Sequence, residues 1–496
     1  MANCAIVGIN WGDEGKGRMV DYLTGQYDVV VRYQGGGNAG HTVINDMGKF
    51  ALHLLPSGVF RPGVMNILGN GVALDCENLV TEMETIRAAG VSISPENLMV
   101  SHRASLLLPW HRELDALEEA RLKDKMYGST KQGIAPFYSD KYQKKTIQAG
   151  ELLYPDRLMA HLQDLLEWKN LILQKVYGAK GYTMAEMTAW LETYAAQVRP
   201  YVADTGRYLR QAQAEGKAIL FEGQLGALRD LDYGIYPYTT SSNTIAAYAP
   251  IGAGLPTAKI DEVVGVVKAY SSCVGEGPFT CEWFGADAEK LREAGAEYGA
   301  KTGRPRRVGP IDLVATRYGV EVQGATNIAL TKLDILSYMN EVPVCAAYEI
   351  DGEITHEFPF PAVLEGQACH GIPAGLGLRY LRRAYMGGYA PGGAGLCGVC
   401  GAGHRLPYRV CLRGRRAREP DHPINKEDRY VSRYVQLPAG IPLCLGLYAA
   451  PVFRRQPLSD LAAAVDGAGP RPAPAGAAHY RSAGRRAGGA YHRHRL

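Results

Sequence analysis

A glycine-rich decapeptide near the start of the chain, GINWGDEGKG at residues 8–17, combines a phosphate-binding pattern with an acidic residue. Free backbone N–H groups in such a turn and the dipole of a following helix both favour phosphate, and Lys16 adds a positive charge. The Walker A pattern fails twice here, because Asn10 stands at its first glycine and Gly17 stands where a Ser or Thr would ligate magnesium. Asp13 is suited to replace that hydroxyl as a ligand of a hard cation, and also to take a proton from a substrate. The alternative interpretation is a glycine-rich turn with a solvent-facing Asp13.

A second glycine cluster lies in DVVVRYQGGGNAGHTV, residues 28–43, directly after an apolar stretch typical of a buried strand. The glycines allow the backbone to approach a ligand closely, and Asn38 and His41 are the side chains presented there. A loop at the carboxyl end of a strand is where α/β sheets bind ligands. A lone histidine is more often structural, so both interpretations of His41 remain open.

Two further stretches carry residues suited to a nucleotide or an acid. In NIALTKLDIL, residues 327–336, the Asp334 carboxylate is able to accept from guanine N1–H and N2–H₂ together, and the Lys332 stem is able to cover the base. In AKTGRPRR, residues 300–307, arginines can make bidentate contacts with a carboxylate or a phosphate. The competing interpretations are an exposed pair at a strand end and a solvated basic face.

The motifs WGDEGKG and QGGGNAGHTV at this spacing resemble the adenylosuccinate synthetase family, which joins IMP and L-aspartate at the expense of GTP. The resemblance implies that Asp13 binds Mg²⁺ and removes the N1 proton of IMP, with the Gly40 carbonyl as a further metal ligand. It implies that the γ-phosphate passes to O6, that aspartate displaces phosphate from 6-phosphoryl-IMP, and that His41 acts as general acid.

The same resemblance implies a set of contacts for each substrate. GTP is expected to contact Gly12, Asp13, Glu14, Gly15, Lys16, Gly17, Gly40, His41, Thr42, Arg306, Lys332, Leu333 and Asp334. IMP is expected to contact Asp13, Lys16, Asn38, His41, Thr130, Lys144, Gln224, Thr240 and Arg304. Aspartate is expected to contact Thr302, Gly303, Arg304 and Arg306.

Two positions depart from the family pattern. Lys144 and Lys145 stand where a pair of arginines is expected, one of which reaches the IMP phosphate of the partner subunit in the family's homodimer. Lysine keeps the charge but loses the bidentate geometry. The stretch 223–226 reads Gly-Gln-Leu-Gly in place of Gly-Ala-Gln-Gly, so the amide of Gln224 is displaced by one residue.

The elements that must position these residues indicate an α/β fold. Helix-like segments such as 112–124 and 155–168 alternate with expected strands, which predicts a large, mostly parallel sheet covered by helices on both faces. The resemblance implies one large α/β body over residues 1–365, related to P-loop NTPases and working as a homodimer. The strands are expected at residues 4–9, 28–33, 64–69, 218–222, 262–268 and 327–331.

Composition bounds the class of protein. A chain of 496 residues with 46% hydrophobic and 21% charged residues is typical of a soluble globular protein. The opening residues MANCAIVGIN lack the features of a signal peptide, so we expect a cytoplasmic protein. We find no apolar run of about 18 residues, and therefore expect no membrane span.

Residues 366–496 differ from the rest of the chain. They contain 20 of the 54 Lys and Arg but 6 of the 50 Asp and Glu, and they are rich in Gly, Ala and Pro. The family's Pro-Gly-Trp segment and its terminal Ser-Val-Gly-Pro stretch, which contacts the guanine nucleotide, are not found. We expect a disordered or aberrant tail, with out-of-frame translation as one hypothesis. A basic tail that binds nucleic acid and a zinc knuckle at Cys397, Cys400 and His404 are the alternatives.

The leading functional hypothesis is an adenylosuccinate synthetase that uses Mg²⁺, with no nucleic-acid or membrane partner. A catalytically impaired guanine-nucleotide-binding relative is the alternative, because the missing C-terminal segment would remove nucleotide contacts. An unrelated P-loop NTPase is a third hypothesis, which the failed Walker A pattern disfavours.

Overall fold

The computed structural model describes residues 3–45, 47–299, 303–364, 370–377, 408–412 and 433–437. All of them belong to the first of two compact units, Met1–Ala449. The tail cysteines and histidine considered as a zinc knuckle, Cys397, Cys400 and His404, lie outside the described residues.

A ten-stranded sheet forms the centre of this unit, in the order β19-β18-β14-β11-β1-β10-β2-β5-β7-β9. Neighbouring strands run parallel except for β18 and β19. Every strand expected from the sequence lies in this sheet, which confirms the α/β fold. The strands are β1 (Cys4–Gly8), β2 (Val29–Arg32), β5 (Met65–Leu68), β7 (Leu98–Ser101), β9 (Val202–Ala203), β10 (Ile219–Gly226), β11 (Glu262–Lys268), β14 (Asn327–Thr331), β18 (Tyr408–Leu412) and β19 (Arg433–Leu437).

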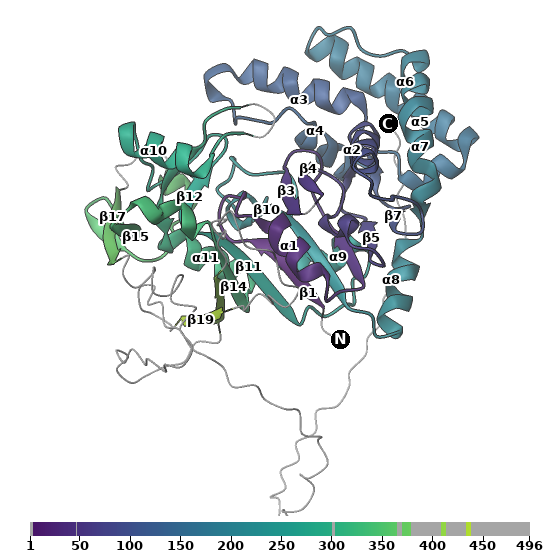
Figure 1. The fold of residues 1–496 in the computed structure, drawn as a ribbon. Coiled ribbons are helices and arrows are strands. Elements are labelled where there is room, and N and C mark those ends of the chain that lie inside the picture. Colours follow the sequence, from purple (N-terminus) through teal and green to yellow (C-terminus); the bar gives the residue numbers. More distant parts are fainter. Residues whose placement is uncertain are drawn as a thin grey trace, which may run out of the picture. The chain divides into compact units, whose positions relative to one another are not determined.

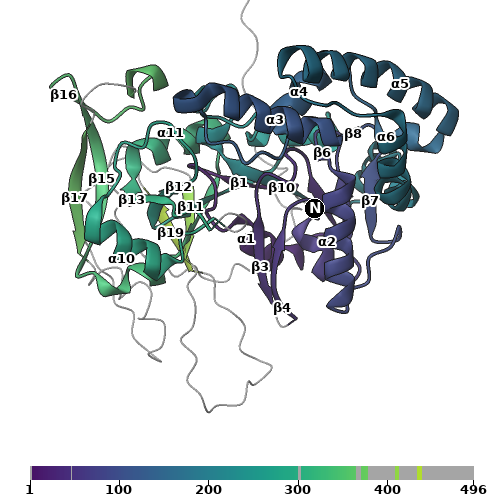
Figure 2. The same ribbon diagram turned by 90° about the horizontal axis from the view of Figure 1, so that it is seen from above.

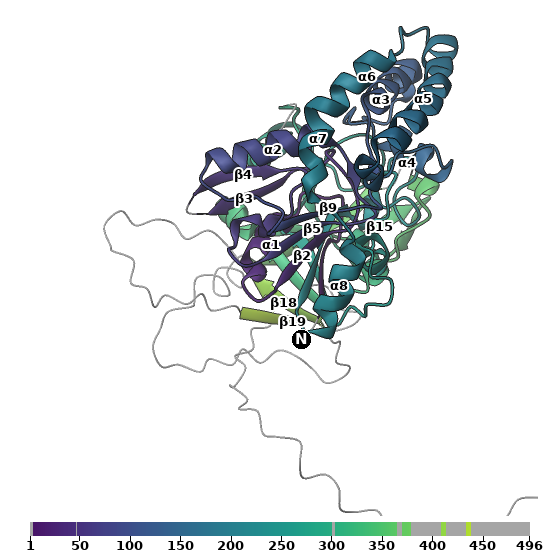
Figure 3. The ribbon, with the colours of Figure 1, turned by 90° about the vertical axis from the view of Figure 1, so that its right-hand side faces the viewer.

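Helices cover the sheet on both faces, and the alternating side chains of β1 pack against helices on each side. Ala5 and Val7 pack into one hydrophobic cluster with α8, α9 and α11, whereas Cys4 and Ile6 pack with α1. Because successive strand residues point to opposite faces, a run that is apolar throughout must be buried on both. Figure 3 shows α1 and α8 on opposite sides of the strands. These helices are α1 (Lys16–Thr24), α8 (Thr205–Ala214), α9 (Ala249–Ala253) and α11 (Leu313–Gln323).

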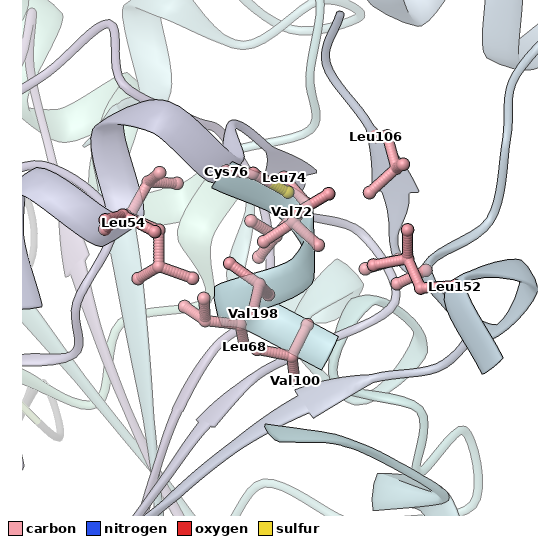
Figure 4. Packing of buried hydrophobic residues seen from close by; sticks show 14 of the residues in the cluster. Leu54, Leu68, Val72, Leu74, Cys76, Val100, Leu106, Leu152 and Val198 are labelled. Atoms are coloured by element: carbon pink, nitrogen blue, oxygen red, sulfur yellow. The ribbon is translucent and has the colours of Figure 1, made fainter. Parts of the chain in front are cut away.

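A mostly helical region, built from segments before and after β7, has its own core. Leu68, Val100 and Val198 lie together there, and they come from segments far apart in the sequence (Figure 4). Figure 2 shows helices α3 to α6 gathered at one end of the sheet. The helices of this region are α2 (Cys76–Ala88), α3 (Pro109–Leu122), α4 (Ile134–Tyr142), α5 (Pro155–Leu171), α6 (Met184–Trp190) and α7 (Ala196–Val198). The two helices expected from the sequence correspond to α3 and α5.

A second sheet, not predicted from the sequence, lies at the other end of the large sheet together with α10 (Gly285–Gly295) (Figures 1 and 2). Its strands follow the order β12-β13-β15-β16, and β17 also pairs with β15. The strands are β12 (Tyr270–Cys273), β13 (Arg307–Asp312), β15 (Glu341–Ile350), β16 (Glu353–Thr355) and β17 (His370–Gly377). Two small ribbons complete the described strands: β3 (His41–Asn45) with β4 (Gly48–Leu52), and β6 (Ala73–Leu74) with β8 (Ser105–Leu106).

Strands β1, β2, β10, β11 and β14 all end at the same edge of the large sheet, because they are parallel. The loops that follow them carry the residues singled out by the sequence, so the sheet gathers these loops along its carboxyl edge. Within the part of the chain that the structure describes, no helix has both the length and the apolar character needed to cross a bilayer.

Candidate functional site

The loop between β1 and α1 is shaped by a buried carboxylate. Glu14 Oε1 accepts hydrogen bonds from Asn10 N (3.1 Å) and Gly12 N (2.8 Å), and Glu14 Oε2 accepts from Lys16 Nζ (2.7 Å). The side chains of Glu14 and Lys16 are both 2% exposed. Asp13 has a left-handed φ of 62°, and its side chain is exposed. The two acids of the loop are thus separated, with Glu14 inside and Asp13 at the surface.

The absence of a side chain at Gly17 allows His41, the first residue of β3, to approach α1. A Cβ at position 17 would lie 2.8 Å from the His41 Cβ and 3.4 Å from its Cα. A Ser or Thr at this position, as in a Walker A loop, would collide with His41. Where a Walker A loop has a Ser or Thr hydroxyl, this chain therefore has His41 packed beside the first turn of α1.

His41 forms a buried dyad with Glu222 of β10. Its Nδ1 lies 2.5 Å from Glu222 Oε1, and that carboxylate also accepts from Ser57 N (2.8 Å) and Ser57 Oγ (2.7 Å). The other ring nitrogen, Nε2, is buried and has no hydrogen-bond partner among the described residues. An unpaired buried polar atom is costly unless a ligand satisfies it, so Nε2 is the atom of this dyad available to a ligand.

The protonation states of the dyad follow from its surroundings. Burial, and then the nearby Arg32 guanidinium, lower the pKa of His41 to about 4. Burial raises the pKa of Glu222, but the His41 hydrogen bond and Arg32 outweigh it, and the net pKa is lowered. The dyad is accordingly a neutral imidazole whose Nδ1–H donates to an ionised Glu222.

Asp13 is paired with an arginine from a distant loop. Arg306 Nη2 lies 2.6 Å from Asp13 Oδ2, and Arg306 Nη1 lies 2.8 Å from Glu297 Oε2. The Asp13 side chain is 37% exposed, whereas that of Arg306 is 12% exposed. Asp13 is thus accessible to solvent, and its carboxylate is paired with the Arg306 guanidinium.

The pair expected to select guanine lies at the end of β14. Thr331 Oγ1 donates to Glu14 O (2.6 Å), which ties this strand end to the loop before α1. Lys332 has a left-handed φ of 56°, Leu333 is buried, and Asp334 is partly exposed in the first turn of the short helix η9 (Leu333–Tyr338). The end of β14 is therefore joined to the glycine-rich loop through Thr331, and Asp334 lies three residues further along the chain.

Three residues expected to contact IMP come together at the ends of β2 and β10. Gln224 Nε2 donates to Asn38 Oδ1 (3.1 Å) and to Gly36 O (2.9 Å), and Asn38 Nδ2 donates to Thr240 Oγ1 (3.5 Å). Gln224 is fully buried, and its Oε1 accepts from Arg32 Nη2 (3.2 Å). The Gln224 amide thus holds the Asn38 side chain, which in turn contacts Thr240.

Thr130 and Lys144 lie apart from that group, in the helical region. The loop that contains Thr130 is held by Asp115, which accepts from Ser129 Oγ (2.7 Å) and Gly133 N (2.8 Å). Lys144 is exposed directly after α4, with a left-handed φ of 62°. Among the described residues, no hydrogen bond joins either residue to Asn38 or Thr240.

The loop expected to contact aspartate is described in part. Arg304 is exposed and pairs with Glu276, with Nη2 2.8 Å from Oε1. Gly303 has a left-handed φ of 63°, and Thr302 lies outside the described residues. Thr42 is exposed on β3, next to His41.

The side chains available here suit a metal ion that a substrate also helps to bind. In the described ranges no group of three or more His, Cys, Asp and Glu side chains is arranged to hold a metal. Magnesium is commonly bound through one or two carboxylates together with phosphate oxygens and water, so Asp13 beside a phosphate loop satisfies its usual requirement.

The sequence analysis missed two carboxylates of this region, Glu222 and Glu297, and one cation, Lys268. For Glu222 the available signal was a charged residue inside the apolar stretch AILFEG, residues 218–223. Nothing in the local sequence distinguishes Glu297 from a surface glutamate, because its importance arises from partners on other strands.

The family model of adenylosuccinate synthetase matches residues 5–370. The adenylosuccinate synthetase of Caldanaerobacter subterraneus subsp. tengcongensis is 46% identical over 359 residues, which cover 72% of this chain and 84% of that protein. Adenylosuccinate synthetase 2 of Pseudoalteromonas translucida is 47% identical over 366 residues, covering 73% and 86%. The solved structure of fully ligated adenylosuccinate synthetase from Plasmodium falciparum is similar with a TM-score of 0.70 at 33% identity, covering 76% of this chain and 88% of that one.

Proposed function

The chain belongs to the adenylosuccinate synthetase family and is a GTP-dependent ligase that forms adenylosuccinate from IMP and L-aspartate, and from that premise we propose which residues carry the reaction. The observation that carries the proposal is the buried, unpartnered Nε2 of His41, which lies beside the first turn of α1 and the glycine-rich loop. In the tautomer that Glu222 sets, Nε2 would accept from a donor group of a ligand, and once protonated it would donate to a phosphate bound at that loop.

Asp13 is proposed to activate IMP. Its carboxylate removes the N1 proton, so that negative charge builds on O6 and this oxygen attacks the γ-phosphate of GTP. Asp13 and the Gly40 carbonyl are the proposed Mg²⁺ ligands, and the ion would neutralise phosphate charge while the phosphoryl group is transferred. Arg306 would have to release Asp13 Oδ2 for that oxygen to act in either role.

His41 and Glu222 are proposed to act together on the transferred phosphate. Glu222 fixes the tautomer by accepting from Nδ1–H, so Nε2 faces the reacting group. The negative charge of Glu222 also stabilises the imidazolium that forms when Nε2 takes up a proton from solvent. His41 then donates that proton as general acid when aspartate displaces phosphate from 6-phosphoryl-IMP.

Each substrate is proposed to use one group of loops. GTP binds along the N-terminus of α1 (Gly12, Glu14, Gly15, Lys16, Gly17), at Thr42 and Arg306, and at Lys332, Leu333 and Asp334. IMP binds near Asn38, Gln224 and Thr240, with Thr130, Arg304 and, from the partner subunit of a cytoplasmic homodimer, Lys144. Aspartate binds the loop that contains Thr302, Gly303, Arg304 and Arg306.

The test is an omission assay on the purified full-length protein. Phosphate release and adenylosuccinate absorbance are followed while IMP, GTP, aspartate or Mg²⁺ is left out in turn. Product formation that requires all four supports the proposal. A folded protein that binds GTP but forms no product would contradict it and favour the impaired relative, whereas ATP turnover without IMP would favour an unrelated NTPase.

A further inference from the structure

Glu297 is a fully buried carboxylate with cations from three separate segments around it. Its Oε1 lies 2.7 Å from Lys332 Nζ and 3.0 Å from Lys268 Nζ, and its Oε2 lies 2.8 Å from Arg306 Nη1. The Tyr270 hydroxyl donates to Oε1 as well. A carboxylate has about four lone-pair sites, so these donors occupy its full capacity.

The charges of this group do not cancel. Glu297 and Asp13 face Lys268, Arg306 and Lys332, which leaves one net positive charge beside the glycine-rich loop. Without Glu297 the three cations would repel one another in a region of low polarity, where such repulsion is poorly screened. The carboxylate therefore allows three cations to remain close together while the group as a whole still attracts an anion.

Glu297 also closes the base of the loop that carries Arg304. Arg306 N donates to Glu297 O (3.0 Å), so the same two residues are joined through backbone and side chain. Within the described ends of the loop, Gly299 N donates to Arg304 O (2.8 Å). A displacement of Glu297 would therefore move Arg304 and Arg306 together.

We infer that Glu297 is a positioning residue, which sets the separation and direction of Lys332 and Arg306 for GTP and holds the base of the neighbouring loop for aspartate. The inference rests on the proposed function in assigning Lys332 and Arg306 to the nucleotide. Glu297 itself has no free lone pair for a substrate, so it acts through the cations it orients. Lys268, which is buried and bonded to the same carboxylate, is the fixed counter-ion of the group.

The test compares Glu297→Gln with a matched change at a neighbouring ion pair. Glu282→Gln removes the carboxylate that pairs with Arg307, the residue after Arg306, and touches neither Lys332 nor Arg306. For Glu297→Gln we expect the KM for GTP and the calorimetric Kd for GTP to rise roughly 10- to 100-fold, since hydrogen bonds to charged groups are lost. The KM values for aspartate and for IMP, both of which are assigned to Arg304, should rise less than the KM for GTP. Glu282→Gln should leave all three KM values within about 2-fold.

Glu297→Asp keeps the charge and should recover part of the GTP affinity, which a purely structural role would not require. Should Glu297→Gln fail to fold, the same comparison of GTP with IMP is made on Glu297→Asp. An unchanged affinity for GTP, or equal increases in the KM values for GTP and IMP, would overturn the inference.

Two further variants separate this inference from the proposed function. If Lys332→Met and Arg306→Leu leave the Kd for GTP unchanged, the assignment of those residues to GTP is wrong. If they raise it and Glu297→Gln does not, only the positioning role of Glu297 is wrong. In the double variant Glu297→Gln with Lys332→Met, the effects on Kd should be less than additive.

Discussion

Arg306 Nη2 lies 2.6 Å from Asp13 Oδ2, although 293 positions separate the two residues in the chain. The guanidinium thus engages one oxygen of the carboxylate that would help to hold Mg²⁺. Asp13 is the residue with the most demanding proposed role, since it must both hold a cation and remove a proton. The pairing makes Arg306 the group that substrate binding has to displace.

Replacing Asp13 with Asn should abolish adenylosuccinate formation without unfolding the protein. Asparagine keeps the size of the side chain but neither removes the N1 proton nor offers the charge that a hard cation requires. Because Asp13 is partly exposed, loss of its ion pair should change the free energy of unfolding by no more than about 1 kcal/mol. Turnover and urea unfolding measure the two effects, and retained turnover would remove Asp13 from the mechanism.

Replacing Glu222 with Gln should lower kcat roughly 100-fold or more, because the imidazolium of His41 would lose its negative partner. The Gln carbonyl can still accept from Nδ1–H, so the ring should keep its position. Ser57→Ala is the control, since it removes one hydrogen bond to Glu222 and leaves the charge. A kcat equal to that of the unaltered enzyme in Glu222→Gln would show that the dyad is only structural.

Replacing Asp334 with Asn should weaken GTP selectively, because the amide offers a single acceptor oxygen and no charge to guanine N1–H and N2–H₂. The KM for GTP should rise roughly 10- to 100-fold while the KM for IMP changes little. Steady-state kinetics with each substrate varied in turn make the measurement. Equal effects on both substrates would contradict the assignment to the guanine base.

Replacing Gly17 with Ser should destabilise the protein, even though it restores a residue of the Walker A pattern. The new Cβ would lie 2.8 Å from the His41 Cβ, so β3 or α1 would have to move. Overpacking of this kind costs about 1–3 kcal/mol, and a displaced His41 should also lower kcat. Gly25→Ser is the control, since nothing lies within 4 Å of a Cβ at that position. Unaltered stability of Gly17→Ser would mean that the contact relaxes freely.

Acid should destabilise the folded protein through His41. The pKa of His41 is about 4 in the folded protein and about 6.5 in an unfolded chain, so unfolding takes up a proton between these values. The contribution of neutral His41 to the free energy of unfolding is fully present above pH 6.5 and is lost as the pH falls to 4. The total change is about 3 kcal/mol. Burial also lowers the pKa of His111, so acid destabilises the protein through that residue as well. The share of His41 is therefore measured by comparing the urea unfolding of His41→Asn with that of the unaltered chain across this pH range. Parallel pH profiles of the two proteins would contradict the prediction.

The apolar runs and the turns determined much of this protein by themselves. Strands such as VVVR are apolar enough to be buried on both faces, and a glycine-rich turn before a helix has few alternatives to an anion site, so local physics specifies both. The failure of the Walker A pattern at Gly17 was also visible in the sequence, but its reason was not. That reason is the position of His41, which only the packing of β3 against α1 reveals.

Tertiary structure alone decided which charged residues act together. His41 and Glu222 are 181 positions apart, and Glu297 meets Lys268 and Lys332 at separations of 29 and 35. A glutamate in an isolated segment carries no mark of its partners, because the pairing energy exists only when the parallel sheet brings its strand ends to one edge. The sequence therefore determined the loops and their chemistry, whereas the protonation of His41, the pairing of Asp13 and the role of Glu297 depend on neighbours that the fold supplies.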